Sequence, residues 1–223
     1  MRNHSRVVII GAGIVGCSVA YHLARLGWTN IIVLDQGPLF KTGGSTSHAP
    51  GMVFQANFSK ILSEFAKYTA ELYGSLDLEG TPCYAAVGGM EIAWTKERWQ
   101  DLKRKTATAK LWGIETDLIT QEEAREMIPL ISKDIFGAMY SLKDGVTEQI
   151  KAAEAMANYA KSLGVEFRGM TEVTGIGVSK GRVTSVSTNE YEITTEHLVI
   201  AAGIWGPLIG QMADLSIPLQ PMR

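Results

Sequence analysis

The 223-residue sequence predicts an α/β protein in which a domain built on a parallel sheet is interrupted by a second, mixed α+β domain. Three observations predict this class. Two β-branched apolar runs, at residues 7–10 and 31–35, flank a helix-like segment, as in a βαβ unit. Residues 172–196 alternate between apolar and polar residues and contain turn signals, which is typical of an antiparallel meander. A late apolar run at 197–203 supplies one more parallel strand.

The remaining elements are predicted from the spacing of apolar residues and from glycines that mark the ends of helices and strands. The segment from about 14 to 26 is apolar nearly all round, so we expect a helix that is covered on most sides. Strands are expected at 83–94 (with a turn or bulge at Gly88-Gly89), at 135–142 and at 165–170. Further helices are expected at 58–73, 96–112, 121–127 and 147–163.

The middle of the chain alternates differently from its two ends, and this difference indicates the domain boundaries. We assign residues 1–80 and 145–216 to the first, discontinuous domain. Residues 81–144 and 217–223 are assigned to the inserted domain, of which this chain holds only a part.

Composition and charge argue against several classes of protein. A formal net charge of -2 gives no bulk electrostatic support for a nucleic-acid partner. No apolar run approaches the roughly 18 residues needed to span a membrane, and the glycine-containing run at 7–20 lacks a signal-peptide cleavage site. Cys17 and Cys83 have no metal-ligand spacing and are too few for a disulfide framework, so we expect packed thiols, no metal and a cytoplasmic location. The basic run at 103–105 is interpreted as a solvated helix face.

The stretch "GAGIVG" places Gly11, Gly13 and Gly16 directly after a strand and at the start of a helix. That context distinguishes a dinucleotide-binding fingerprint from a chance run of glycines. Gly11 permits the tight turn, Gly13 lets the backbone approach a pyrophosphate, and Gly16 lets the helix pack closely on the strand. The helix N-terminus then offers N–H groups and a partial positive charge to the phosphates.

Asp35 ends the second strand, about 20 residues after the last glycine, where a carboxylate can accept a ribose hydroxyl. The alternative is an aspartate that only caps the turn before Gly37-Pro38. The first domain is therefore expected to be Rossmann-like, with a β-meander, and the fingerprint alone fits FAD or NAD. The loop "GGSTSHAPG" at 43–51 favours FAD, because a glycine- and hydroxyl-rich loop could run along the ribityl chain and the flavin ring.

The sequence resembles the dimethylglycine oxidase, dimethylglycine dehydrogenase and sarcosine dehydrogenase group of the D-amino-acid-oxidase-like flavoproteins. The resemblance covers essentially all 223 residues and is carried by "VVIIGAGIVG", "VLDQGPL", "GGSTSHAPG", "FAKYT", "VGGMEIA", "VTGI" and "AAGIWG". The most specific of these motifs is "GSTSHAPG". The resemblance implies an enzyme whose Rossmann-like FAD-binding domain is interrupted by a mixed α+β substrate domain.

The resemblance also implies which residues bind FAD. The family attaches its flavin covalently to a histidine of this loop, which here is His48. The ADP half would be held by Ile14, Val15, Asp35 and Gln36, and the adenine by the backbone of Val173. The rest of the cofactor would lie along Gly44, Ser45, Thr46, Ser47 and Met52, and close to Ala202 and Gly203.

Other candidate residues have simpler interpretations. Without its context, a loop histidine such as His48 is more often a solvated side chain than a functional one. His4, His22 and His197 are interpreted as structural or solvated. Trp205 could line a cage for a methylated ammonium group, since aromatic faces attract such cations, but tryptophans are more often core or interface residues.

The implied reaction is oxidation of the N-methyl C–N bond of a small methylated glycine, dimethylglycine or sarcosine, by hydride transfer to the flavin N5. The imine product would be hydrolysed to formaldehyde, or captured by tetrahydrofolate if a downstream folate-binding domain exists. Oxygen or an electron-transfer flavoprotein would reoxidise the flavin. Two alternatives stay open: oxidation of another small amino acid (glycine, proline or a D-amino acid), and a non-catalytic FAD-binding fragment.

The resemblance further suggests that this chain is the N-terminal fragment of such an enzyme. The family's oxidase module is longer, and the residues thought to handle the amine come after the segment "SIPLQPMR". We therefore assign no catalytic residue within the chain. We also expect the 223 residues to fold poorly alone, because elements that would cover their apolar faces are missing.

Overall fold

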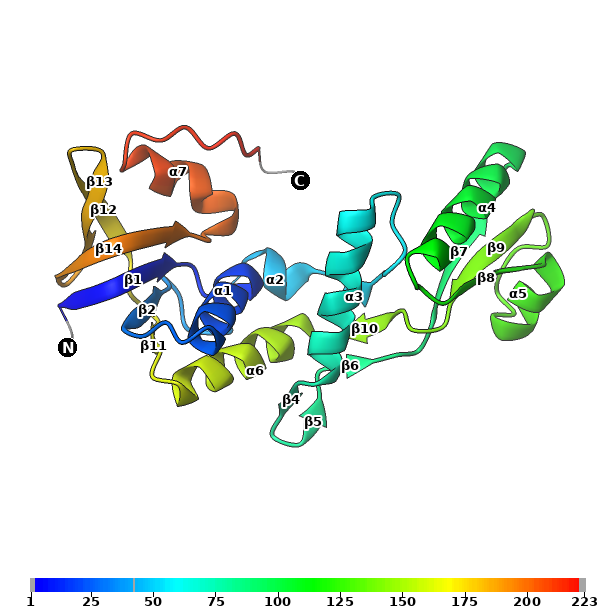
Figure 1. The fold of residues 1–223 in the computed structure, drawn as a ribbon, viewed down its shortest axis with the longest axis horizontal. Coiled ribbons are helices and arrows are strands. Elements are labelled where there is room, and N and C mark those ends of the chain that lie inside the picture. Colours follow the sequence, from blue (N-terminus) through cyan, green and yellow to red (C-terminus); the bar gives the residue numbers. More distant parts are fainter. Residues whose placement is uncertain (1–2, 42, 221–223) are drawn as a thin grey trace. The chain divides into compact units, whose positions relative to one another are not determined.

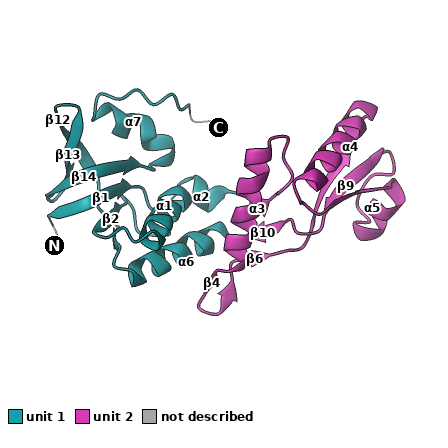
Figure 2. Cartoon of the chain, in the orientation of Figure 1, with its two compact units in different colours: residues 1–50, 149–223 teal, residues 51–148 magenta. Residues whose placement is uncertain are grey.

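The computed structural model describes residues 3–41 and 43–220, which fall into two compact units (Figure 2). Unit 1 comprises the described residues up to Pro50 and from Gln149 onward, and unit 2 comprises Gly51–Glu148. Each unit combines helices with a sheet, and unit 1 contains the parallel strands. The predicted α/β class is therefore confirmed, and so is the interruption of one compact unit by another along the chain.

Unit 1 is built on a six-stranded sheet with the strand order β11-β2-β1-β14-β13-β12 (Figure 1). The strands are β1 (His4–Ile10), β2 (Ile31–Leu34), β11 (Glu166–Arg168), β12 (Val173–Ser179), β13 (Arg182–Thr188) and β14 (Glu192–Ile200). β11, β2, β1 and β14 run parallel to one another, whereas β14, β13 and β12 form an antiparallel meander. The βαβ start and the meander are both as predicted.

The helices of unit 1 are α1 (Ile14–Arg25), α2 (Ser45–His48), α6 (Gln149–Ser162), the 3-10 turn η1 (Gly203–Trp205) and α7 (Gly206–Gln211). They cover both faces of its sheet, with α1 and α6 on one face and α7 on the other (Figure 1). Val7 and Ile9 of β1 pack against α1 and α6, whereas Val8 and Ile10 pack against the meander and α7. Both faces of β1 are thus buried, which explains its continuously apolar sequence.

The late strand predicted at 197–203 is the second half of β14 and not a separate strand. Residues from Glu192 to Thr194 pair antiparallel with β13, and residues from Thr194 onward pair in parallel with β1. A strand has two hydrogen-bonding edges, so one extended segment can serve both neighbours without an intervening turn. The turn signals within residues 172–196, Lys180-Gly181 and Asn189-Glu190, lie on either side of β13, as an antiparallel meander requires.

Unit 2 contains a three-stranded antiparallel sheet of order β7-β9-β8, a second small sheet of order β3-β10-β6, and the pair β4-β5. Its strands are β3 (Met52–Val53), β4 (Asp77–Leu78), β5 (Thr81–Pro82), β6 (Tyr84–Ala85), β7 (Gly89–Ala93), β8 (Thr116–Ile119), β9 (Gly137–Ser141) and β10 (Gly145–Thr147). Its helices are α3 (Lys60–Gly74), α4 (Lys96–Leu111) and α5 (Gln121–Met127). The helices predicted in this region are confirmed to within about two residues.

The strand predicted across 83–94 is divided into β6 and β7. The break falls at Gly88, where a turn or bulge was expected and where the backbone has a φ of 82°. A Cβ at this position would lie 2.4 Å from the Tyr140 hydroxyl oxygen. The chain therefore needs a glycine here both for its left-handed backbone and for the close approach of Tyr140.

The compact units divide the chain at positions that differ from the predicted domain boundaries. Helix α3, which we assigned to the first domain, belongs to unit 2 and packs on β6. Ile217, which we assigned to the inserted domain, contacts Gly210 of unit 1, and residues 221–223 lie outside the described part of the chain. Periodicity indicates where a helix forms, but it does not indicate which sheet that helix covers.

The basic run at 103–105 is not uniformly solvated, contrary to our interpretation. Lys105 is only 8% exposed, and its Nζ lies 2.5 Å from Glu91 Oε2. It lies one helical turn from both Leu102 and Ala109, which are fully buried, so it projects from the inner face of α4. Arg98 also pairs with Glu91, so this carboxylate is shared by two cations.

Asp144 is a second buried charged residue of unit 2, and it is 3% exposed. Its Oδ1 accepts the Gln55 N–H at 2.9 Å. Burial raises the pKa of Asp144 above its ordinary value of 3.8, and the negative charge of Glu91 adds to this effect. The Gln55 hydrogen bond and the positive charge of Lys105 oppose it, but burial dominates.

We predict that Asp144→Asn removes a pH-dependent destabilisation. Because the pKa of Asp144 is raised in the folded state, the wild-type protein should lose stability as pH rises from 3.8 through the folded-state pKa. The amide oxygen of asparagine can still accept the Gln55 N–H but carries no charge. Urea unfolding at about pH 4 and about pH 7 gives the difference in free energy of unfolding between the variant and wild type. This difference should change in favour of the variant as the pH rises. A constant or decreasing difference would contradict the prediction.

Candidate cofactor-binding site

Three backbone segments of unit 1 meet closely at the end of β1. Gly11 has a φ of 105° and its N–H donates to Leu34 O at 2.7 Å. A Cβ on Gly11 would lie 2.4 Å from Ala201 O, and a Cβ on Gly16 would lie 1.8 Å from Gly11 O. Both distances are far below van der Waals contact, so only glycine fits at either position. The tight turn predicted at Gly11 and the close helix packing predicted at Gly16 are both present.

The N-terminus of α1 follows this turn and carries features that suit an anion. Gly13 occupies the N-cap position without a side-chain cap, and the first turn of the helix contains no acidic residue. The Ile14 N–H donates to Thr46 Oγ1 at 3.0 Å, and a Cβ on Gly13 would lie 3.1 Å from the same oxygen. Thr46 therefore reaches the helix start, where backbone N–H groups and the helix dipole favour negative charge.

Asp35 follows β2 and organises the glycine turn. Its Oδ2 accepts the Ala12 N–H at 2.8 Å, and its Oδ1 accepts the Gly37 N–H at 2.9 Å. The bond to Gly37 is the turn-capping role that we considered as the alternative. The bond to Ala12 shows that the carboxylate also holds the loop between β1 and α1. Two carboxylate oxygens can accept about four hydrogen bonds, so acceptor capacity remains for ribose hydroxyls.

The loop at 43–51, which we expected to be irregular, contains the single helical turn α2. Local hydrogen bonds to one carbonyl explain this turn: Gly44 O accepts the Ser47 N–H at 3.1 Å and the Ser47 hydroxyl at 2.8 Å. His48 Nδ1 lies 3.0 Å from the same oxygen. Because a carbonyl can only accept, Nδ1 carries a proton in this arrangement. The His48 side chain is exposed.

The other predicted site residues lie at several places in the fold. Ala202 and Gly203 follow β14 beside the glycine turn, and Val173 opens β12 and is buried. Gln36 and Ser45 are exposed, and Val15 is 60% exposed on α1. Met52 is exposed at the start of β3 and belongs to unit 2. The structure therefore places every predicted site residue except Met52 in unit 1.

Two contributors to this site were not predicted. Ala12 donates its N–H to Asp35, and Ala201 approaches the glycine turn and donates its own N–H to Ile10 O at 2.8 Å. Both act through the backbone, which a side-chain motif does not reveal. The only signal available for Ala201 was the change to small residues at the end of the apolar run "HLVIAAG".

The remaining cysteines and histidines have structural partners. Cys17 is buried, its Sγ contacts Ala12 O at 3.3 Å, and burial raises the pKa of its thiol to about 12, with the charge of Asp35 adding to the effect. Such a thiol is a packed group and not a nucleophile. His22 Nδ1 bonds to Ser18 O at 2.7 Å, His4 Nδ1 bonds to Thr194 Oγ1 at 3.0 Å, and His197 packs edge-on against Trp28.

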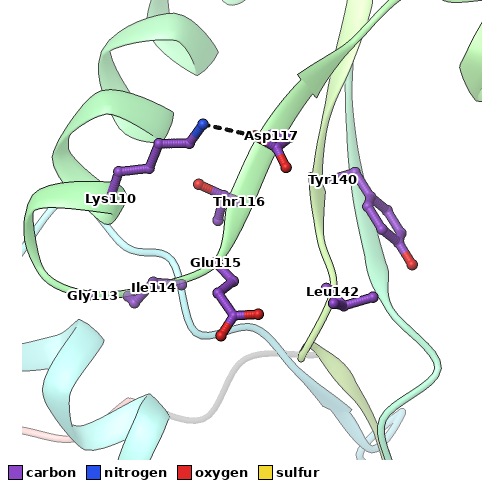
Figure 3. Close-up of a pocket in the computed structure, with 8 residues that line it drawn as sticks. All are labelled: Lys110, Gly113, Ile114, Glu115, Thr116, Asp117, Tyr140 and Leu142. Carbon is purple, nitrogen blue, oxygen red and sulfur yellow. Dashed lines mark hydrogen bonds and ion pairs between the residues drawn. The ribbon is translucent and has the colours of Figure 1, made fainter.

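A pocket of about 590 Å³ lies in unit 2, beside the end of α4 and strands β8 and β9 (Figure 3). Lys110 and Asp117 on its rim pair with each other at 2.7 Å, and Glu115 pairs with Lys143 at 2.6 Å. Because these charges are already matched, the pocket offers little to recognise an ionic ligand.

Within residues 3–41 and 43–220, no group of acidic, histidine or cysteine side chains could hold a metal ion. No helix in that same part of the chain has the length and apolar character needed to cross a membrane.

The fold and this site define a dinucleotide-binding α/β protein. More specifically, the chain belongs to the DAO family of FAD-dependent oxidoreductases, whose family model matches residues 6–223. It is 36% identical to the mitochondrial pyruvate dehydrogenase phosphatase regulatory subunit of Mus musculus, over 96% of this chain and 25% of that protein. It is 30% identical to human mitochondrial sarcosine dehydrogenase, over 98% of this chain and 25% of that protein.

A solved structure agrees with the family. L-proline dehydrogenase from P. horikoshii superposes with a TM-score of 0.88 at 26% identity, over 99% of this chain and 58% of that one. The predicted family resemblance is therefore confirmed. The chain spans about a quarter of the length of the curated relatives it matches.

We predict that Gly16→Ala destabilises unit 1, because the added methyl group cannot fit beside Gly11 O. The free energy of unfolding should fall by about 1–3 kcal/mol, the usual cost of overpacking. Urea unfolding measures this loss. Ser18→Ala, two positions along the same helix and only partly buried, is the matched control and should change stability by about 0.5 kcal/mol or less. Equal stabilities of the two variants would contradict the close approach of Gly16 to Gly11 O.

Proposed function

We propose that unit 1 is the FAD-binding domain of an amine oxidoreductase and that unit 2 belongs to its substrate domain. The observation that carries the proposal is the glycine-only contact between the end of β1, the start of α1 and the end of β14. It places the N-terminus of a twelve-residue helix, whose positive dipole end favours an anion, next to a carboxylate that can accept hydroxyl groups. A dinucleotide presents both groups, a pyrophosphate and a ribose.

The residues of unit 1 fit FAD group by group. The pyrophosphate would lie at the start of α1, against the backbone of Gly13 and beside the Gly11 turn, where the helix dipole favours negative charge and the first turn has no acidic residue to repel it. Asp35 would accept the adenosine ribose hydroxyls while its present bonds to Ala12 and Gly37 keep it oriented. Ile14, Val15, Gln36 and the backbone of Val173 would complete the ADP half.

The loop that contains α2 would lie along the other half of FAD. Gly44, Ser45, Thr46, Ser47 and Met52 would contact it, and Ala202 and Gly203 would pass close to it. His48 would tether the flavin through Nε2, since its Nδ1–H is already donated to Gly44 O at 3.0 Å. This bond would replace a C–H bond of the flavin 8-methyl group, so attachment needs an oxidant such as oxygen or another electron acceptor.

The proposed substrate is a small methylated glycine, sarcosine or dimethylglycine, and the proposed reaction is oxidation of its N-methyl C–N bond. Support comes from the motif "GSTSHAPG" and from the 30% identity to a sarcosine dehydrogenase. FAD, when bound, would supply the hydride acceptor. The described residues of this chain would hold and orient the cofactor. We assign no residue among them to binding or deprotonating the amine.

The remaining partners of this reaction are also proposals. Oxygen or an electron-transfer flavoprotein would take the electrons. Tetrahydrofolate would be a co-substrate only together with a folate-binding region. The cytoplasmic location stays a prediction from cysteine use, and the two curated relatives named above are mitochondrial proteins.

A second candidate is a non-catalytic role, and one observation favours it. The identity of 36% to a phosphatase regulatory subunit exceeds the 30% identity to sarcosine dehydrogenase over almost the same residues. A regulatory protein could keep the FAD-binding unit without the amine chemistry. Turnover separates these two candidates, because both predict that FAD binds.

We predict that the purified protein, with its flavin, is bleached anaerobically by sarcosine or dimethylglycine. Loss of the visible flavin absorbance measures the transfer of electrons from the amine. Glycine, proline and D-alanine serve as comparison substrates, and faster bleaching by one of them would favour the alternative specificity within the same family. A flavoprotein that none of these amines reduces would contradict the oxidoreductase proposal and favour the regulatory role.

We predict that His48→Ala leaves FAD bound but no longer covalently attached. The exposed ring would be the tether, whereas the contacts to the ADP half do not involve it. Flavin absorbance of the acid-precipitated protein measures attachment: wild type should stay yellow and the variant should lose its flavin to the supernatant. His22→Ala, which removes a ring bonded to Ser18 O on α1, is the control and should stay yellow. Release of flavin from wild type by acid would exclude the tether.

A further inference from the structure

The helical turn α2, which carries His48, is too short to hold its own position. It comprises four residues, and a single turn fixes several backbone angles for very few internal hydrogen bonds. The bonds to Gly44 O shape the turn and direct the His48 ring, but both partners of each bond lie within residues 44–48. The orientation of the turn within unit 1 is therefore set by contacts to other elements.

Two such contacts lie on either side of His48, and all of their residues belong to unit 1. Thr46 Oγ1 accepts the Ile14 N–H at 3.0 Å, which joins the turn to the start of α1. Ala49 O accepts a hydrogen bond from Nε2 of Gln149, the first residue of α6. One contact alone would let the turn pivot about it, whereas two contacts near its two ends fix its direction.

The two helices that provide these contacts are packed together. α6 contacts α1, and Ala160 of α6 lies in the same core cluster as Ala20 and Ala24 of α1. Met156 of α6 is 1% exposed. Gln149 therefore projects from a helix whose position is fixed by the core of unit 1, and this makes it suitable as an anchor.

The Ala49 carbonyl needs a donor from outside the turn. Ala49 is the C-cap of α2, and its φ of -68° and ψ of 145° lead the chain into an extended course. The chain continues to β3 and not to a further helical turn, and Pro50 has no N–H to offer. The side-chain amide of Gln149 supplies the donor, so its bond fixes the residue directly after His48.

We propose that Gln149 is a positioning residue for flavin attachment: its amide holds Ala49 O, and together with Thr46 it fixes the turn so that the His48 ring meets the cofactor in one direction. The proposal rests on the proposed function, because the tether through His48 is part of it. Gln149 touches no cofactor in this role. Its contribution is one N–H donor, presented from the start of α6 to the residue after His48.

The step that benefits is the formation of the tether. His48 Nε2 gains a bond to the carbon of the flavin 8-methyl group, and that carbon loses a C–H bond. One proton leaves the carbon and one leaves the imidazole, while two electrons reduce the flavin and pass on to oxygen, which becomes hydrogen peroxide. The new bond forms only when the ring nitrogen and the methyl carbon are held close together and aligned, so the rate of attachment depends on the direction of the ring.

Two variants of Gln149 separate the donor from the bulk of the side chain. Gln149→Ala removes both, whereas Gln149→Glu keeps the size and, at neutral pH, replaces the donor with an oxygen that can only accept. Both variants should therefore lose the bond to Ala49 O. Gln121→Ala is the matched control, because Gln121 is the first residue of α5 and donates its own Nε2 to a backbone carbonyl, that of Lys133.

The first test mixes flavin-free protein with FAD and follows two signals. Quenching of flavin fluorescence gives the dissociation constant of FAD, and acid-stable flavin in timed samples gives the rate of attachment. Gln149→Ala and Gln149→Glu should attach flavin about fivefold more slowly, the change in population that one ordinary hydrogen bond produces. Their dissociation constants should match wild type, since Gln149 contacts no group of FAD, and Gln121→Ala should match wild type in both signals. A general loss of folding would weaken both signals together.

The second test measures the motion of the turn by NMR relaxation and needs no flavin. In wild type, the backbone amides of residues 46–49 should have order parameters of about 0.85, as rigid backbone does, and in Gln149→Ala they should fall below about 0.6. The amides of α1 and α6 should keep their wild-type values in the variant. Order parameters below about 0.6 for the turn in wild type would overturn the proposal even if the Gln149 variants do not fold.

The outcomes distinguish this proposal from the proposed function. Covalent flavin in wild type together with an unchanged attachment rate in Gln149→Ala would overturn the positioning role and leave the tether standing. Slow attachment in the alanine variant but not in Gln149→Glu would also overturn it, because the donor would then not matter. Flavin that acid releases from wild type would refute the tether and the positioning role together, while bleaching of that flavin by sarcosine would still support the oxidoreductase.

Discussion

The cofactor site depends on one packing constraint: three pieces of backbone touch at the end of β1 with no side chain between them. A methyl group on Gly16 would lie 1.8 Å from Gly11 O and overlap it, and one on Gly11 would lie 2.4 Å from Ala201 O. A side chain on Gly11 would displace the end of β14, and one on Gly16 would move α1 away from β1. The N–H groups at the start of α1 would move with it, and both the Ala12 bond to Asp35 and the Ile14 bond to Thr46 would be lost.

Asp35 and Thr46 show how the same groups can stabilise the fold and still be available to a ligand. Each accepts backbone N–H groups at 2.8 to 3.0 Å, so each is oriented before any cofactor binds. Asp35 places its negative charge at the end of β2, while the first turn of α1 is free of acidic residues. Hydroxyl groups and phosphates of the proposed cofactor would therefore meet separate surfaces, an acceptor for the first and a positive helix end for the second.

Much of this arrangement could be predicted from the sequence, because the elements of unit 1 have clear periods. The apolar runs of β1 and β2, the glycine spacing and the position of Asp35 all lie within one continuous stretch. The errors arose where long-range contacts decide. β14 serves two neighbours and so needs no break, and Lys105 lies on the inner face of α4 because it pairs with Glu91. The sequence around each of these residues does not indicate which distant residues will contact it.

His48 bears on whether the protein is an enzyme or a regulatory relative. The glycine turn and Asp35 would serve either role, because both roles could require bound FAD. His48 differs, since its exposed ring fills no core, and the hydrogen bonds that the described residues show for it, to Gly44 O and to Ser47 Oγ, both involve Nδ1 and none involves Nε2. An exposed ring with a fixed tautomer adds little to folding stability. The proposed tether would give such a residue a role, and a permanently attached flavin is of most use where the cofactor must pass repeatedly between oxidation states.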